Sequence, residues 1–98
     1  MISFEELLFL KKDGLVPDDI PMLLQALLLD AAGDWDNAHR IAQDDYSQDG
    51  SWVHAYLHRE EGDLGNASYW YRSAGKKIPR MSLEEEWEYI AMALIKKS

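Results

Sequence analysis

Apolar residues recur at helical spacing along the chain, and no stretch alternates between polar and apolar residues over the length of a strand. Near each end, a serine is followed three residues later by a glutamate, the capping box that opens a helix: Ser3 with Glu6, and Ser82 with Glu85. The first box predicts a helix to about Lys12, and the second a helix over residues 82–97. Both ends of the chain are therefore expected to be helical.

Four more helices are predicted between these two from caps and apolar spacing. Their approximate ranges are 21–32, 34–45, 51–61 and 63–74, with a polar linker over residues 46–50. The second helix of the chain is apolar nearly all round, so we expect it to be the most buried. Six short helices require short antiparallel connections, which predicts a single all-α domain over residues 1–98.

One phrase occurs twice in the chain. Gly33–Ala38 reads GDWDNA, and 29 residues later Gly62–Ala67 reads GDLGNA. Glycine relaxes a turn, aspartate caps the next helix, and alanine allows another helix to approach closely. Each copy therefore predicts a helix hairpin. Two copies predict stacked units over residues 18–46 and 49–79, followed by the capping helix at 82–97.

The second copy resembles the second half of a tetratricopeptide (TPR) repeat. The residues that carry the resemblance have the spacing of that family: Gly62, Asp63, Ala67, Tyr71, Ala74 and Pro79. The period of 29 is shorter than the family's usual length of about 34 and lies nearer to Sel1-like and other degenerate repeats. The resemblance implies a right-handed solenoid of helix hairpins with flanking helices, and a protein-interaction module.

The resemblance also implies a binding face. Its concave positions include five partner-binding candidates: Leu23, Leu27, Trp52, Tyr56 and Arg59. The last three share one helix face, and Trp, Tyr and Arg are enriched in binding hot spots. The alternative is that the first or sixth helix covers this face, so that Trp52 and Tyr56 belong to the core.

Three histidines form a second candidate cluster. His54 and His58 are four residues apart, a spacing that lets two imidazoles reach one metal ion, and His39 belongs to the neighbouring predicted helix. A carboxylate such as Glu61 or Asp63 could join them. The alternative is a set of neutral, buried imidazoles that hydrogen-bond to carbonyls or tyrosines. The spacing defines no third ligand, so no metal and no cofactor is assigned from the sequence.

Composition and charge limit the classes of partner. Eighteen acidic and ten basic residues give a net charge of -8, and the lysine pairs lie far apart, which argues against nucleic-acid binding and favours a neutral or basic protein partner. The chain has no cysteine, no apolar run of about 20 residues, and acidic residues where a signal peptide carries bases. We therefore expect a cytoplasmic protein that does not bind membranes.

Sequence motifs of enzymes are not found. There is no glycine-rich phosphate loop, no G-x-S-x-G elbow and no H-E-x-x-H pattern, so catalysis has little support. Three hypotheses remain open at this point. The chain is a small TPR-like interaction module, a ligand- or metal-binding protein that uses His39, His54 and His58, or a self-associating protein, such as a homodimer, that buries Trp70 and Trp87.

Overall fold

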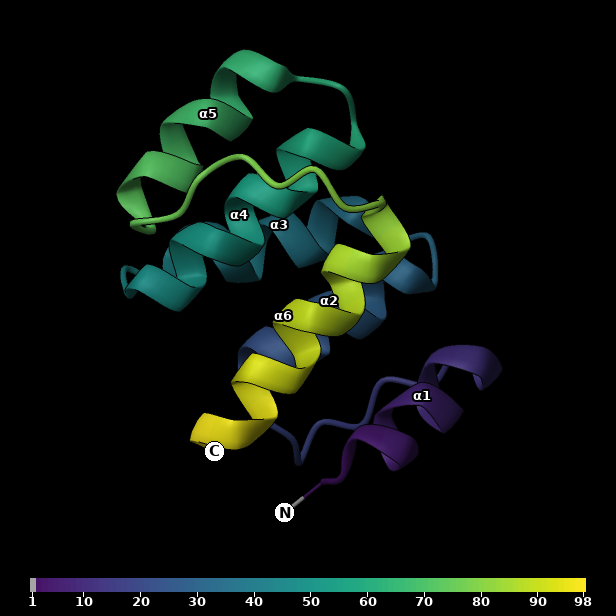
Figure 1. Ribbon diagram of the computed structural model, residues 1–98. Coiled ribbons are helices and arrows are strands. Elements are labelled where there is room, and N and C mark those ends of the chain that lie inside the picture. The colour runs from purple at the N-terminus through teal and green to yellow at the C-terminus, as the bar shows by residue number, and fades with distance from the viewer. Residues whose placement is uncertain (1) are drawn as a thin grey trace.

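The computed structural model describes residues 2–98, which form six α-helices and no strand (Figure 1). The helices are α1 (Phe4–Asp13), α2 (Met22–Ala31), α3 (Trp35–Asp44), α4 (Gln48–Glu60), α5 (Leu64–Ser73) and α6 (Leu83–Lys97). The predicted all-α class is therefore confirmed for the described part of the chain.

Both capping boxes form as the sequence predicts. The Ser3 hydroxyl accepts a hydrogen bond from the Glu6 backbone N–H at 3.1 Å, and the Glu6 carboxylate accepts one from the Ser3 N–H at 3.2 Å. The equivalent bonds between Ser82 and Glu85 measure 3.1 and 3.0 Å. These local bonds satisfy backbone donors that a helix leaves free at its start, which is why α1 and α6 begin where they do.

The expected linker over residues 46–50 is wrong in its second half, because α4 already begins at Gln48. The hydroxyl of Ser47 caps the helix by accepting a hydrogen bond from the Gly50 N–H at 3.0 Å. Gly50 is buried, and a Cβ at this position would collide with the carbonyl oxygen of Asp45. Polar composition suggested a linker here, whereas the serine cap and a close backbone approach make the segment helical.

The two copies of the repeated phrase form turns of the same geometry. Gly33 and Gly62 adopt left-handed φ angles of 93° and 86°, which glycine tolerates better than other residues. The aspartate that follows each glycine accepts hydrogen bonds from the backbone N–H and the side-chain amide of an asparagine: Asp34 with Asn37, and Asp63 with Asn66. Helices α2 and α3 form one hairpin in this way, and α4 and α5 form the other.

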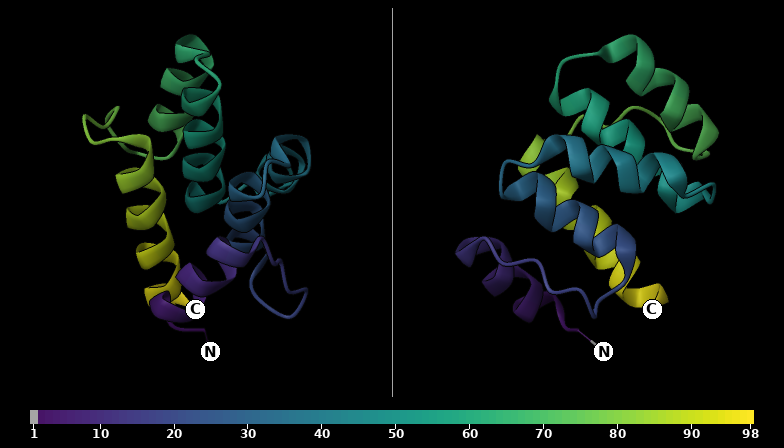
Figure 2. Two further views of the ribbon diagram at one scale, coloured as in Figure 1. Left: turned by 90° about the vertical axis from the view of Figure 1, so that its right-hand side faces the viewer. Right: turned by 180° about the vertical axis from the view of Figure 1, so that it is seen from behind.

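The hairpins stack, and the sixth helix covers one side of both. Helix α5 lies at one end of the molecule and α1 at the other, where the described N-terminal and C-terminal segments also meet (Figure 1). Helix α6 packs on α2 and α4 (Figure 2). The indole Nε1 of Trp87 donates a hydrogen bond to the Leu27 carbonyl at 2.9 Å, which joins α6 to the buried helix α2.

A buried ion pair also holds the start of α6 in place. The carboxylate of Glu86 is 1% exposed, and the Arg59 guanidinium on α4 donates to it at 2.8 Å. The Tyr71 hydroxyl on α5 lies 2.7 Å from the same carboxylate and donates to it as well. Burial and these carboxylate contacts raise the pKa of Tyr71 above its usual range. The charge of Glu86 is thus compensated inside the protein, as a buried carboxylate requires.

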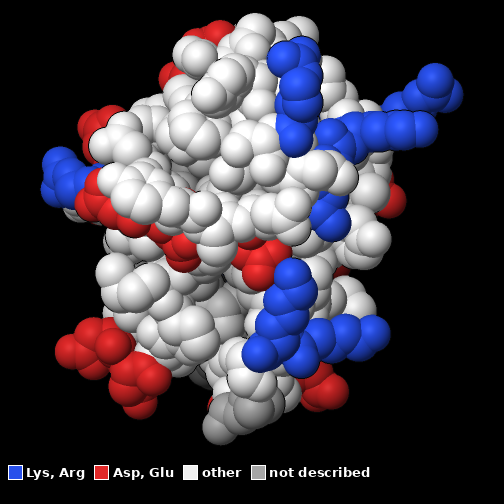
Figure 3. All heavy atoms as spheres, turned by 90° about the vertical axis from the view of Figure 1, so that its left-hand side faces the viewer, with Lys and Arg blue, Asp and Glu red and all other residues white. Residues whose placement is uncertain are grey.

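Surface charge is unevenly distributed. On the face shown in Figure 3, lysine and arginine side chains gather along one side, while acidic side chains lie mainly along the other. The net charge of -8 therefore does not describe every face of the protein. Among the described residues, no helix is both long enough and apolar enough to span a bilayer.

Candidate functional site

Three histidines converge where the two hairpins meet. His39 lies on α3, while His54 and His58 lie one turn apart on α4. These two helices pack against each other, and one ligand nitrogen from each ring lies within 4.8 Å of the others. The structure therefore supplies the third member that sequence spacing alone left undefined.

Two tryptophans hold the imidazole rings from either side. The Trp35 ring stacks on His39 with centroids 4.7 Å apart, and the Trp70 ring stacks on His54 at 4.0 Å. The Trp35 indole also donates a hydrogen bond to the Leu57 carbonyl at 2.9 Å, which fixes its orientation. Rings held by such stacking have few rotamers available, so the cluster is partly preorganised.

The helix that we expected the Trp70 ring to pack against is wrong. From the sequence, the expected neighbour of this ring is the sixth helix, with a second subunit or a ligand as alternatives, whereas α5 reaches α6 through the Tyr71–Glu86 hydrogen bond. Trp70 instead faces α4, where it covers His54. Trp35 is a member of the site that sequence reasoning missed, although its spacing of four residues from His39 on one helix places the two rings on the same face.

The three histidines differ in their hydrogen bonds. The Nδ1 of His58 lies 2.7 Å from the Glu61 carboxylate. His39 and His54 have no hydrogen-bond partner within residues 2–98, and no buried side-chain nitrogen in this range lacks one. The unbonded nitrogens of His39 and His54 therefore keep some contact with solvent, although His54 as a whole is buried. The bonds to backbone carbonyls or tyrosines that the sequence suggested for His54 and His58 are absent from the described structure, and His58 bonds to Glu61.

The environment keeps two of the rings neutral at pH 7. Burial, with a smaller contribution from the neighbouring histidines, lowers the pKa of His54 from 6.5 to about 4. Burial also lowers the pKa of His39, and the proximity of His58 adds to that effect. Neutral imidazole is the form that coordinates a metal ion, so neither ring has to lose a proton before binding.

The expected partner-binding face is covered. Leu23, Leu27, Trp52 and Tyr56 are 9%, 0%, 4% and 3% exposed, and Arg59 is engaged with Glu86. These residues belong to the core beneath α6, which is the alternative that the sequence left open. The four apolar side chains are packed inside the protein, so this structure does not present them to a partner.

One of the two tryptophans in the self-association hypothesis, Trp87, is not available to a second copy of the chain. Trp87 is 2% exposed and is buried within its own chain, beneath the Lys11 ammonium at 4.3 Å from the ring centroid. Trp70 remains partly exposed at the histidine cluster. A homodimer that buries both rings against a second copy is therefore not compatible with this fold.

A second titratable pair lies between the ends of α2 and α4. Burial and a hydrogen bond to Asp30 raise the pKa of the Glu60 carboxyl from 4.5 to about 8. Burial likewise raises the pKa of Asp30. The hydrogen bond between the two carboxyl groups raises the pKa of Glu60 and partly opposes the effect of burial on the pKa of Asp30. The pair lacks a third ligand among the described residues, and it is separate from the histidine cluster.

No family model matches the chain, and no curated protein or solved structure is significantly similar to it.

Proposed function

We propose that this protein binds one divalent transition-metal ion, of which Zn²⁺ is the best candidate, through His39, His54 and His58. The observation that carries the proposal is the convergence of three ligand nitrogens within 4.8 Å of one another. Imidazole is a preferred ligand of zinc and copper, and the chain offers no thiolate that would select a softer ion.

The geometry is close to that of a bound site. Two nitrogens that each lie about 2.1 Å from a tetrahedral zinc ion are about 3.4 Å apart. The ligand nitrogens lie within 4.8 Å of one another, so the rings would have to bring them closer by up to about 1.4 Å to share one ion. The tryptophans that stack on His39 and His54 restrict larger motions, which lowers the entropic cost of binding.

Glu61 has a supporting role in this proposal. Its carboxylate accepts a hydrogen bond from Nδ1 of His58 at 2.7 Å, which leaves Nε2 free to bind the ion. A carboxylate behind a metal-binding histidine fixes the tautomer and makes the ring a better ligand. Three protein ligands leave one tetrahedral position for water or for an external ligand.

The consequence of binding is a cross-link between the hairpins. His39 belongs to the first hairpin, whereas His54 and His58 belong to the second. An ion shared by the three residues stabilises the folded chain in proportion to its occupancy. The proposed role is therefore a metal-binding module whose rigidity depends on the metal. Partner binding stays a prediction from the TPR resemblance and would require a surface other than the buried residues named above.

The test is a metal titration of purified, chelator-treated protein with Zn²⁺, with Mg²⁺ as a control ion. We expect one bound Zn²⁺ per chain after dialysis, no bound Mg²⁺, and a higher melting temperature with Zn²⁺. The variants His39→Gln, His54→Gln and His58→Gln should each abolish stoichiometric binding. Glu61→Gln should weaken it by about tenfold or more.

Asp63→Asn is the matched control. A second group of potential ligands consists of His58, Glu61 and Asp63, whose ligand atoms also lie within 4.8 Å of one another. Asparagine preserves the helix cap at position 63 but removes a charged ligand. Normal Zn²⁺ binding by Asp63→Asn supports the three-histidine site. Binding that survives His39→Gln but fails in Asp63→Asn would contradict it.

A further inference from the structure

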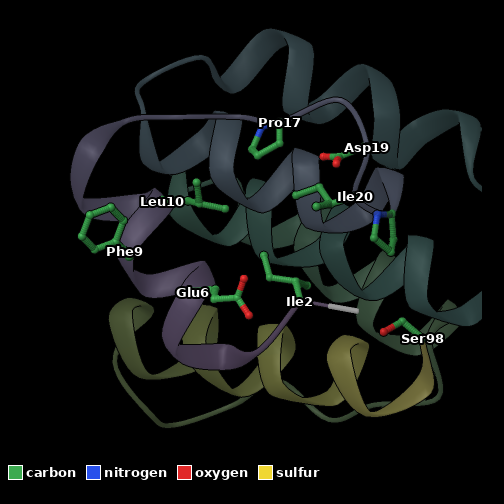
Figure 4. A pocket seen from close by; sticks show the side chains of 9 residues that line it. Ile2, Glu6, Phe9, Leu10, Pro17, Asp19, Ile20 and Ser98 are labelled. Carbon is green, nitrogen blue, oxygen red and sulfur yellow. The ribbon is translucent and has the colours of Figure 1, made fainter.

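A cavity separate from the histidine cluster lies between α1, the segment that precedes α2, and the C-terminal end of α6. Its volume is about 730 Å³, which is within the range of small-molecule sites. The residues that line it are Ile2, Glu6, Phe9, Leu10, Pro17, Asp19, Ile20, Pro21 and Ser98 (Figure 4).

The lining combines an apolar floor with negative charge. Leu10 and Ile20 come from α1 and from the segment before α2, and their side chains border the space in the centre of Figure 4. Glu6 and Asp19 add carboxylates, and among residues 2–98 no lysine, arginine or histidine lines the cavity. The site would therefore repel a carboxylate or phosphate ligand and attract a cation that carries an apolar body.

The two carboxylates are not equally available. One oxygen of Glu6 already accepts the Ser3 N–H in the capping box of α1. Asp19 makes no hydrogen bond through its side chain and no ion pair with residues 2–98. Phe9, at the edge of the cavity on the side away from Asp19, is 65% exposed and extends the apolar surface (Figure 4).

We propose that this cavity binds a small organic cation with an apolar body, an aliphatic amine or quaternary ammonium compound. The apolar body packs on Leu10 and Ile20, and the charged group lies beside Asp19. This assignment does not depend on the metal site, since the cavity and the histidines share no residue.

The test is an NMR titration with hexyltrimethylammonium, with hexanoate as a probe of the same chain length and opposite charge. We expect saturable shifts of the backbone signals of Phe9, Leu10 and Ile20 with the cation, and weaker or no binding of hexanoate. Asp19→Asn should weaken cation binding about threefold to fivefold, whereas Asp18→Asn, a change at the exposed neighbour outside the lining, should leave it unchanged.

Three results would overturn the proposal. The first is the absence of saturable shifts, and the second is equal affinity for the cation and for hexanoate. The third is a change of the Leu10 and Ile20 signals with protein concentration alone, which would show that a second copy of the chain occupies the cavity. Glu6→Gln provides a further check, because glutamine retains the capping box and removes only the charge.

Discussion

The two helix hairpins have the same turn but carry different chemistry. In both, a left-handed glycine precedes an aspartate cap, at Gly33 and Asp34 in the first and at Gly62 and Asp63 in the second. The side chains that make the site are not repeated. The positions of the first hairpin that lie 29 residues before His54 and His58 are Gln25 and Leu29. The position of the second hairpin that lies 29 residues after His39 is Ser68.

This difference concerns the junction between the two hairpins. Helices α3 and α4 belong to different copies, and with two copies the contact between such helices occurs only once. The histidines lie on the faces that meet at this contact. The turn sequence builds each hairpin, while a few unrepeated residues make the junction a candidate site.

The largest expected effect comes from Arg59, whose counterpart in the first hairpin is Asp30. Arg59→Met should lower the free energy of unfolding by about 3–5 kcal/mol, because the Glu86 carboxylate would stay buried without its cation. Asp30→Asn should retain or raise stability at pH 7, since it removes a buried carboxyl with a raised pKa. Urea unfolding measures both. Adding Glu86→Gln to Arg59→Met should recover part of the loss, and a loss below about 1 kcal/mol for Arg59→Met alone would refute the ion-pair account.

A moderate effect should be shared by the two hairpins. Ala38 and Ala67 are 0% and 1% exposed at equivalent positions. Leucine at either position should overpack the helix contact and cost about 1–3 kcal/mol, by similar amounts in the two copies. The exposed Ala31 is the control, and Ala31→Leu should change stability by less than about 0.5 kcal/mol. Urea midpoints that differ strongly between Ala38→Leu and Ala67→Leu would show that the hairpins are not equivalent.

The smallest expected effect is a difference in the pH dependence of stability, caused by His54 in the second hairpin. The variant His54→Gln places glutamine in the second hairpin, as Gln25 occupies the equivalent position of the first. The folded-state pKa of His54 is about 4, below the ordinary 6.5, so its contribution to stability is present above pH 6.5 and is lost as the pH falls toward 4. Between pH 7 and pH 4.5, the metal-free wild type should lose about 1 kcal/mol more than His54→Gln, once solvent screening is considered. Parallel stability curves for the two proteins would show that His54 does not titrate as proposed.

Local signals made most of the helix starts predictable. The capping boxes at Ser3 and Ser82 and the aspartate caps are satisfied by bonds within four residues, so they can be read from neighbouring residues alone. The start of α4 was missed because the Ser47 cap lies within a run of polar residues typical of a linker. Local chemistry thus indicates where a helix begins more reliably than composition does.

The site was predictable only in part. The i, i+4 spacing placed His54 and His58 on one helix face, but the position of His39 depends on how the hairpins pack. The position of α6 was left open for the same reason. Its cover over Trp52 and Tyr56 depends on the contacts of Trp87 and Glu86, which are distant from those residues in the sequence.

The most direct test of the central claim is an isotope-edited NMR titration of the three histidine rings with Zn²⁺. If residues from both hairpins hold one ion, the ring signals of His39, His54 and His58 change together and stop changing at one equivalent. The signal of Nδ1 in His58 should retain its proton, because Glu61 accepts that hydrogen bond. A change confined to His58, or no saturable change in any of the three rings, would contradict the account.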